Sequence, residues 1–499
     1  MDDEGQTVRR LAGLAFAIGV AIICAAHIGS PNVVFEGNAG AYPVRVVVRP
    51  PEVVPGLAQV IVRVNSPDAR RVEIRPVFWR AGARGAPSGD EMEPVSGEKQ
   101  TYGGQLWLMA YGAYSVYVTV DGSHGVGTVV VPVNSFATGR LGLSRGLGAI
   151  LVVLGLLLCG GLITIVRAAG GESLVAPGEA LEPGRRRRAN IRAFAFTPIL
   201  ALVVFGGAKW WNAEDAGYRR FMYASPAADP TFDVHDTHRT LRLAVHDTSA
   251  FNVIVSRVAP DHGKMMHLFL VSEPGMERFA HLHPSQTDSL VFEGEIPSLP
   301  AGNYRLFGDI TLESGLSVTV TNTLALPETK GPVVPSDSDD VVVSSSTVPR
   351  IAPGATQSLD GGYTIEWSGD SALTSRRTTD LKFTVRDARG AVASLDPYLG
   401  MAAHAVVLRD DGSVFIHLHP MGTVSMTGQE IFRARDRGDT TAGGRLEPDA
   451  LQPMPMSGMH MNGVFSFPYE FPKSGRYRLW VQFKPGGTVL TGVFDADVR

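Results

Sequence analysis

The second half of the chain repeats one pattern of histidines and aromatic residues. Each copy has a single histidine, then a His-Leu-His-Pro block, and then a Gly-x-Tyr-Arg-Leu block. The blocks are His267, His281–Pro284 and Gly302–Leu306 in the first copy, and His404, His417–Pro420 and Gly475–Leu479 in the second. Because order and chemistry match through every block, the sequence predicts an internal duplication of one β-domain.

A turn signal in the second copy predicts how its histidines face one another. Asp411-Gly412 favours a type I′ hairpin turn, because these residues tolerate the positive φ angles that such a turn needs. That turn places Val406 opposite His417 and His404 opposite His419. Since side chains alternate across a strand, His417 shares a face with His419 and lies diagonally across from His404.

The first copy gives the same arrangement with a longer connecting loop. Setting Phe279 opposite Val271 brings His267 opposite His283 and leaves His281 on the diagonal. The loop length differs between the copies, but the predicted three-histidine face does not.

Three neutral imidazoles this close together favour a bound Zn²⁺ or Cu²⁺, whereas three protonated imidazoles would repel one another. The predicted metal ligands are His267, His281 and His283 in one site and His404, His417 and His419 in the other. Asp309 is predicted to supply an oxygen ligand to the first site, with Gln482 as its counterpart in the second copy. The competing interpretation is structural, because a histidine at a strand end is often half-buried and bonded to the backbone.

Thioethers near these histidines favour copper over zinc, since soft sulfur selects Cu(I) and mixed His and Met ligation fits copper in either oxidation state. The additional candidate ligands are Met266, Met401, Met456, Met459, His460 and Met461. The structural alternative is that methionines fill irregular gaps in a core. The histidines without a repeated geometry are predicted to lie on the surface: His235, His238, His246 and His262.

Three apolar segments indicate a membrane protein. Residues 1–30 contain the uncharged run Leu11–Ile28 after two arginines, which suits either a signal anchor or a signal peptide. Residues 146–166 are long enough to cross the hydrocarbon core as a helix. Residues 193–211 form a third span, with Pro198 in its first turns and a Lys-Trp-Trp anchor at its end.

Charge predicts the orientation of these spans. The loop of residues 167–192 carries six arginines, so the positive-inside rule makes it cytoplasmic and places the β-domains on the extracytoplasmic side of the cell membrane. A basic loop between two spans is explained by topology, although a nucleic-acid or lipid patch would have the same composition.

The exported parts are predicted to be β-rich. Short runs of β-branched and aromatic residues, separated by Pro, Gly, Asp and Asn turns, predict a sandwich over residues 31–140. The two repeat copies occupy residues 228–326 and 351–499, joined by a Pro/Ser/Asp-rich linker at residues 327–350. The predicted fold class is mainly β, with three immunoglobulin-like antiparallel β-sandwich domains and two or three transmembrane helices.

Composition excludes several function classes. Lys plus Arg number 45 against 49 Asp plus Glu, so no global basic field is present to hold nucleic acid. The two cysteines, Cys24 and Cys159, both lie in apolar runs, so no disulfide framework or cysteine nucleophile is expected in the exported domains. No carboxylate pair or Ser-His-Asp set can be assigned, so an enzyme is not predicted and no catalytic residue is named.

The exported domains resemble the YtkA-like and FixH-like β-sandwich modules of bacterial envelope proteins, which are similar to CopC-like copper carriers. The likeness rests on Gly40-Ala-Tyr42-Pro-Val, on Pro50-Pro51, and on the paired His-Leu-His-Pro and Gly-x-Tyr-Arg-Leu blocks. It implies an immunoglobulin-like sandwich, an envelope location and the handling of copper or another heavy metal. CopC-like carriers use an amino-terminal histidine, which only cleavage before His27 would supply here.

The leading functional prediction is a membrane-tethered envelope protein that captures or delivers copper, with zinc as the second choice of ion. Its expected partners are the metal ion, the membrane and another envelope protein. The alternative is a structural or interaction scaffold of the cell envelope that holds no metal. The two differ in whether the histidines bind an ion or are satisfied by hydrogen bonds.

Overall fold

The computed structural model describes most of the chain as two separate units. The described residues are 32–172, 175–176, 178–235, 238–247, 256–328, 337–343, 351–369, 372–441, 444–451 and 460–499. One unit contains the β-domains, which occupy residues up to 138 and from 223 onward, and the other spans Gly139–Met222. The predicted signal anchor or signal peptide at residues 1–30 lies outside the described residues.

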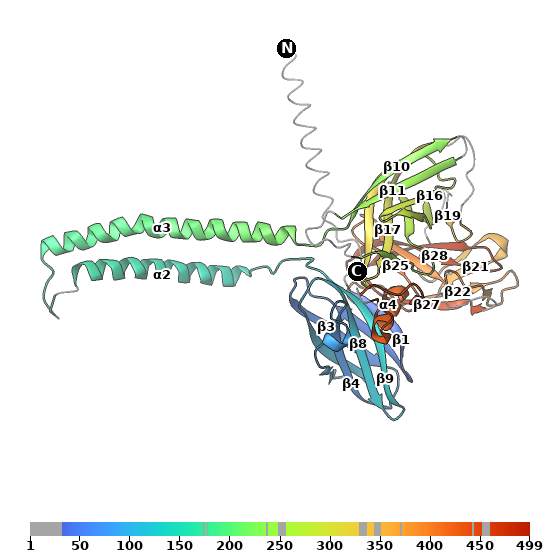
Figure 1. Cartoon of the computed structure of the whole chain (residues 1–499), viewed down its shortest axis with the longest axis horizontal. Helices are drawn as coiled ribbons and strands as arrows, with labels where there is room; N and C mark the ends of the chain where they lie inside the picture. The colour runs from blue at the N-terminus through green and yellow to red at the C-terminus, as the bar shows by residue number, and fades with distance from the viewer. Residues whose placement is uncertain are drawn as a thin grey trace, which may run out of the picture. The chain divides into compact units, whose positions relative to one another are not determined.

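The N-terminal β-domain is built from two antiparallel sheets that pack on each other (Figure 1). One sheet has the order β1 (Val33–Ala39), β2 (Tyr42–Arg49), β3 (Gly56–Val64), β7 (Thr101–Leu108) and β6 (Glu93–Pro94). The other has the order β5 (Asp90–Glu91), β4 (Ala69–Phe78), β8 (Gly112–Gly122) and β9 (Gly125–Ser135). Alternate residues of β2 are buried, as at Val44, Val46 and Val48, which is the pattern of a strand with one face in a core. This part of the chain is therefore sandwich-like, as predicted.

The first repeat copy forms one long sheet path. Its order is β15 (Ser285–Asp288), β16 (Val291–Glu295), β11 (His238–His246), β10 (Ala227–His235), β18 (Ser317–Leu326), β17 (Gly302–Leu312), β13 (His267–Ser272), β14 (Phe279–Leu282) and β19 (Val341–Val343), with β12 (Val258–Ala259) beside β17. Only one residue pair, Ala227 with Thr321, joins β10 to β18. The path therefore folds into two layers around one core.

The second repeat copy has two separate four-stranded sheets. Their orders are β20 (Thr356–Ser358), β21 (Thr364–Trp367), β22 (Thr378–Arg386), β27 (Val464–Glu470), and β25 (Phe415–Leu418), β24 (His404–Arg409), β28 (Gly475–Phe483), β29 (Leu490–Val498). A third pair joins β23 (Ser394–Leu395) to β26 (Met461–Asn462). Helix α4 (Met426–Arg437) follows the histidine block and was not predicted; Ser425 caps its start and Gly438 its end.

Strand order and register agree with the predicted duplication. The order β14-β13-β17-β18 in the first copy matches β25-β24-β28-β29 in the second. Val271 lies opposite Phe279, as predicted. Val406 lies opposite His417, also as predicted.

The turn between β24 and β25 differs from the prediction. Gly412 has a positive φ of 75°, but Asp411 is not among the residues with positive φ, so the predicted type I′ turn does not form. Instead, the amide of Gly412 donates to the carbonyl of Arg409, and the amide of Arg409 donates to the carbonyl of Val414. A four-residue loop centred on the same two residues keeps the same register, so the facing histidines are unaffected.

The two repeat copies pack against each other through β13, β14, β17, β24, β25, β28 and β29. Nine side chains form this shared core: Phe269, Val271, Phe279, Phe307, Val406, Leu408, Phe415, Trp480 and Val493. Two equivalent arginines cross the interface, because Arg305 donates to the carbonyl of Asp410 and Arg478 to the carbonyl of Met276. The repeats therefore pair in a nearly symmetric way.

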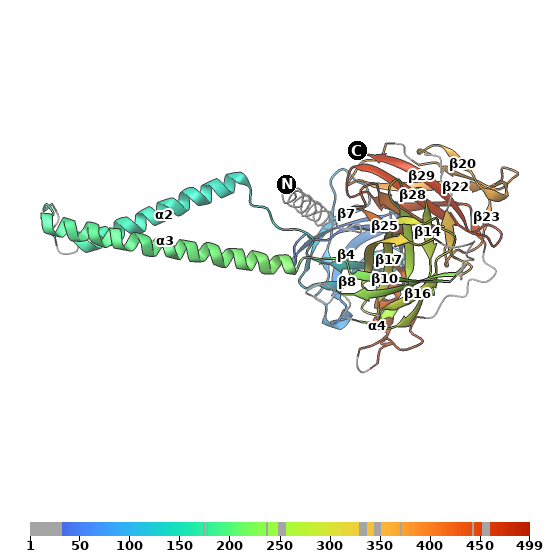
Figure 2. The same cartoon turned by 90° about the horizontal axis from the view of Figure 1, so that it is seen from above.

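The second unit is a pair of long helices that run side by side, α2 (Arg145–Gly171) and α3 (Pro183–Arg220) (Figure 1, Figure 2). Both are long and apolar enough to cross a membrane. They extend beyond the predicted spans, so the six arginines predicted to lie in a loop at residues 167–192 are in helical turns. Pro198 consequently lies inside α3 and not in its first turns, where Pro183 stands instead.

Candidate metal centre

The predicted histidines gather where the two repeats face each other. Along β13, Leu268 and Leu270 enter the core of the first repeat, while Phe269 and Val271 enter the core shared with the second. His267 is two residues from Phe269, so its side chain points to the same face of the strand, the one that meets the second repeat. The same alternation holds in β24. Ala405 and Val407 lie in the second repeat's own core, so His404 points to the interface between the repeats.

Within each copy the three imidazoles lie close together. The ring centroids of His267, His281 and His283 are 4.6–5.3 Å apart. Those of His404, His417 and His419 are 4.7–5.3 Å apart. Both predicted sets of three are therefore assembled.

The two sets are not separate sites, which corrects the expectation of one independent site in each domain. The ring of His417 is 5.1 Å from that of His267 and 5.6 Å from that of His281. Strand periodicity identified the face that carries the histidines, but the partner covering that face is the other repeat. The six imidazoles form one cluster.

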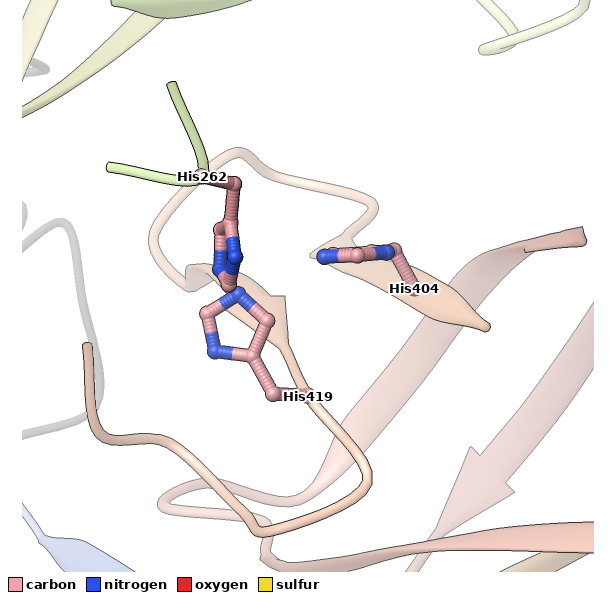
Figure 3. A group of neighbouring side chains, drawn as sticks. All are labelled: His262, His404 and His419. Carbon is pink, nitrogen blue, oxygen red and sulfur yellow. The ribbon is translucent and has the colours of Figure 1, made fainter. Parts of the chain in front are cut away.

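A seventh histidine joins this cluster, and its predicted surface location is wrong. The side chain of His262 is only 6% exposed, and its ring lies 5.3 Å from that of His404 and 5.1 Å from that of His419. Figure 3 shows His262 arriving from a different chain segment than His404 and His419. One possible ligand nitrogen from each of these three lies within 4.8 Å of the others, and the same holds for His267, His281 and His283.

Local backbone geometry holds His262 in place. Asp261 and Lys264 exchange backbone hydrogen bonds, and the two residues between them have positive φ, 53° at His262 and 79° at Gly263. This is the geometry of a type I′ turn, in which a left-handed conformation costs a non-glycine residue about 1 kcal/mol. The Asp-His-Gly-Lys sequence was the available signal for this turn. The second copy has a matching turn at Tyr398–Met401, with positive φ at Leu399 and Gly400, but leucine stands there in place of the histidine.

Six imidazole nitrogens of the cluster are buried without a hydrogen-bond partner among the described residues. They are Nε2 of His262, His283, His417 and His419, and both ring nitrogens of His404. An unsatisfied buried polar atom costs about 1–3 kcal/mol. Six of them together cost about 6 kcal/mol or more, which is comparable with the whole stability of a typical domain.

Several histidines are oriented by a bond to the other ring nitrogen. His283 Nδ1 lies 3.0 Å from a carboxylate oxygen of Asp340, and His419 Nδ1 lies 3.0 Å from the carbonyl oxygen of Val424. Such a contact fixes the ring and leaves Nε2 as the ligand atom, the usual arrangement around protein-bound metals. In His281, Nδ1 lies 2.9 Å from Gln482 Oε1 and Nε2 lies 3.1 Å from His267 Nδ1.

Burial keeps these histidines neutral. It lowers the pKa of His267, His281, His404 and His417 well below the ordinary value, and the neighbouring imidazoles add to the effect. Burial, with His262 second, lowers the pKa of His419 to about 4. Neutral imidazole is the form that binds a metal ion.

Two carboxylates border the cluster. Burial raises the pKa of Asp309 to about 7. Burial would also raise the pKa of Asp261, but nearby His262, His419 and His267 lower it to about 2. The cluster therefore contains one carboxylate that is charged near neutral pH and one that is partly protonated there.

Asp309, the predicted oxygen ligand, lies opposite His267, as Gln482 lies opposite His404. Its Oδ2 is 3.8 Å from Nδ1 of His417 in the other repeat, and its Oδ1 accepts a hydrogen bond from Thr319 at 2.6 Å. The carboxylate thus borders His417 and is not part of the His267, His281 and His283 group.

The candidate thioethers are dispersed. Met266 packs in the core of the first repeat and Met461 against the core of the second. Met401 is buried in a turn closed by backbone hydrogen bonds with Tyr398, and His460 is exposed beside Asp396. Met456 and Met459 lie outside the described residues.

Comparison with known proteins identifies a family model for the repeat region alone. Residues 231–327 and 356–499 match the model described as Domain of unknown function (DUF8832), and the gap between the matched segments coincides with the linker. No curated protein matches the chain.

Among solved structures, a tetra-tandem repeat in the extending region of a large adhesion protein aligns over 89% of this chain and 71% of its own, at 10% identity and a TM-score of 0.17. The ICAM-5 D1–D4 ectodomain fragment aligns over 89% and 73%, at 8% identity and a TM-score of 0.14. The BSP domain of a biofilm associated protein aligns over 95% and 67%, at 10% identity and a TM-score of 0.13. Scores this low carry no functional argument.

Proposed function

We propose that this is a membrane-tethered envelope protein that binds transition-metal ions in the histidine cluster between its two repeats, for capture or delivery and without catalysis. The observation that carries the proposal is the set of six buried imidazole nitrogens without hydrogen-bond partners among the described residues. Bound ions would satisfy up to five of those nitrogens, one from each ring, and would remove most of the cost of burying them.

The two histidine groups are suitable for one ion each. Ligand nitrogens around a tetrahedral ion, at about 2.0 Å from it, are about 3.3 Å apart. The candidate nitrogens of each group lie within 4.8 Å of one another, so small ring rotations would bring them into range. His417 lies between the groups and can complete either one.

Copper is the proposed ion, and zinc is the second choice. A site made of imidazole nitrogens binds Cu²⁺ more tightly than Zn²⁺ in the general order of divalent affinities. Met266 packs in a core and not in the cluster, so the argument for copper rests on nitrogen affinity and not on sulfur.

The setting in the cell is also part of the proposal. Helices α2 and α3 would anchor the chain in the cell membrane, with residues 167–192 on the cytoplasmic side and the β-domains outside. Immunoglobulin-like topology of the three β-domains and kinship with the YtkA-like, FixH-like and CopC-like modules belong to the same set of predictions. Another envelope protein would supply or receive the ion.

The test is a competition titration of metal-free full-length protein in detergent with Cu(II), Cu(I) and Zn(II) separately. We expect two tightly bound Cu(II) ions, with one lost in His262→Ala, because His262 belongs to the group with His404 and His419. The matched control is His246→Ala, whose side chain is 52% exposed and which lies outside the cluster. Weak binding that His262→Ala leaves unchanged would favour the envelope scaffold without metal.

A further inference from the structure

A large cavity leads to the histidine cluster from one side. Its volume is about 950 Å³, and its lining includes His267, His417 and His419 together with Asp261 and Asp309. The nitrogens Nε2 of His417 and His419 are among those without a partner in the described part of the chain. The cavity therefore reaches the rings of His417 and His419, and small ring rotations would turn these buried nitrogens toward an ion in it.

The N-terminal β-domain supplies one wall of the cavity. The lining includes Arg49, Glu52, Gln59 and Asn134 from that domain. This wall is held against the second repeat by ion pairs, Arg45 with Asp380 at 2.8 Å and Arg49 with Glu470 at 2.7 Å. The domain has few groups for chemistry of its own, so a role in shaping this cavity accounts for its attachment to the repeats.

The size of the cavity points to a ligand larger than a hydrated ion. One water molecule occupies about 30 Å³ of liquid, so an ion with six waters needs about 200 Å³. Pockets that bind small organic molecules are about 300–1,000 Å³. The cavity falls in the second class.

Charge on the lining indicates which organic ligand would fit. Arg376 and Lys473 line the cavity, and neither side chain has an ion pair among the described residues. Arg49, by contrast, is neutralised by Glu470, whose side chain is fully buried. The lining also contains the carboxylates of Glu52, Asp261 and Asp309, which suit the metal ion, while the two cations without an ion pair suit carboxylate groups of its ligand.

We propose that this cavity binds a carboxylate chelate of the metal ion, such as a complex with a small hydroxy acid, and that the ion passes from it to the histidines. This inference rests on the proposed function. In the transfer, metal–oxygen bonds to the chelate break as metal–nitrogen bonds to imidazoles form, and the free carboxylate ligand leaves the cavity. The oxidation state of the ion does not change.

The test compares two complexes of Cu(II) on metal-free full-length protein, an anionic one with citrate and a cationic one with ethylenediamine. We expect the rate of copper transfer from citrate to saturate with concentration. In Arg376→Ala/Lys473→Ala the half-saturating concentration of the citrate complex should rise about tenfold, the effect of removing two charge-assisted contacts. Transfer from the ethylenediamine complex should be unchanged.

The matched control is Lys382→Ala/Arg389→Ala, which removes two exposed cations that do not line the cavity. The inference would be overturned if the rate of copper transfer rose linearly with the concentration of the citrate complex. It would also be overturned if that rate were equal in the parent and in Arg376→Ala/Lys473→Ala. The cavity would then be a passage for the bare ion. Equilibrium binding of weakly buffered Cu(II) distinguishes failure of this inference from failure of the proposed function. If the parent protein does not bind Cu(II) in that assay, the proposed function is overturned as well.

Discussion

Phe307 of the first repeat stacks on Phe415 of the second, with ring centroids 4.1 Å apart and planes 7° from parallel. The equivalent pair, Trp480 of the second repeat and Phe279 of the first, stacks at 4.7 Å and 13°. Two matching stacks related by the duplication show that the repeats pair symmetrically. Both stacks belong to the shared core beside the histidine cluster. Packing between the repeats therefore fixes the distance between the histidines of the first repeat and those of the second.

Truncation of this core should therefore weaken the protein and the proposed metal site together. We expect Phe415→Ala to lower the free energy of unfolding of the β-unit by about 3–4 kcal/mol, the usual cost of removing a buried aromatic side chain. Copper affinity should fall as well. Chemical denaturation and metal titration check this, with Trp107→Ala as control because Trp107 is 56% exposed. A change no larger than the control's would contradict the assigned interface.

The stability of the metal-free protein should fall in acid. The cluster histidines have a lower pKa folded than unfolded, so below about pH 6.5 the unfolded chain binds more protons than the folded one. For His419, whose folded pKa is about 4, the loss reaches about 3 kcal/mol once the pH is near 4. Thermal unfolding from pH 7.5 to 4.5 measures this. A flat profile, or one unchanged in His419→Gln, would refute the burial of these imidazoles.

The carboxyl group of Asp309 should have the opposite effect on the pH dependence of stability. Its pKa is raised to about 7 in the folded state, so stability is lost as the pH rises from about 4 to 7. Asp309→Asn keeps an acceptor for Thr319 and removes the charge. We expect it to stabilise the metal-free protein at pH 8 by about 2 kcal/mol. The whole pKa shift corresponds to about 4 kcal/mol, and the smaller figure allows for solvent screening, because the side chain is 22% exposed. The gain should shrink at pH 5.5, and an equal effect at both pH values would argue against this assignment.

The repeated tyrosines should contribute equally in the two copies. Tyr304 donates to the carbonyl of Pro300 at 2.9 Å, and Tyr477 donates to the carbonyl of Lys473 at 2.7 Å. These are tyrosine corners, in which the hydroxyl bonds to the backbone a few residues upstream. Tyr304→Phe and Tyr477→Phe should each cost about 1 kcal/mol in denaturant unfolding. If neither variant changes stability, the repeated Gly-x-Tyr block has another role.

The sequence was sufficient for the mainly β character of the repeats and for the register of their histidine-bearing strands, but not for helix α4 or for the pairing of the repeats. Alternation along the strands predicted which residues share a face, and so the pairs His267 with His283 and His404 with His419. Alternation does not identify what covers that face. The apolar run Leu268–Val271, buried on both sides, was the signal that another layer lies over it.

Each difference between the sequence predictions and the structure has a physical reason. Met266 and His267 are adjacent, and neighbours in a strand point to opposite faces, so both could not serve one site. Leu399 replaces His262 in the matching turn of the second copy, so the repeated histidine pattern gave no indication of His262. The helices exceed their apolar segments because arginine is a good helix former, and the hydrocarbon-length criterion marks only the part that would lie in lipid.

The most direct test of the metal centre is X-ray absorption spectroscopy at the copper edge of the loaded full-length protein. The cluster predicts a nitrogen shell at about 2.0 Å, with the outer-shell scattering of about three imidazoles per ion. That scattering should decrease in His404→Ala and remain unchanged in His246→Ala. A first shell of sulfur at about 2.3 Å, or one of water oxygens without imidazole scattering, would contradict a metal site built from these histidines.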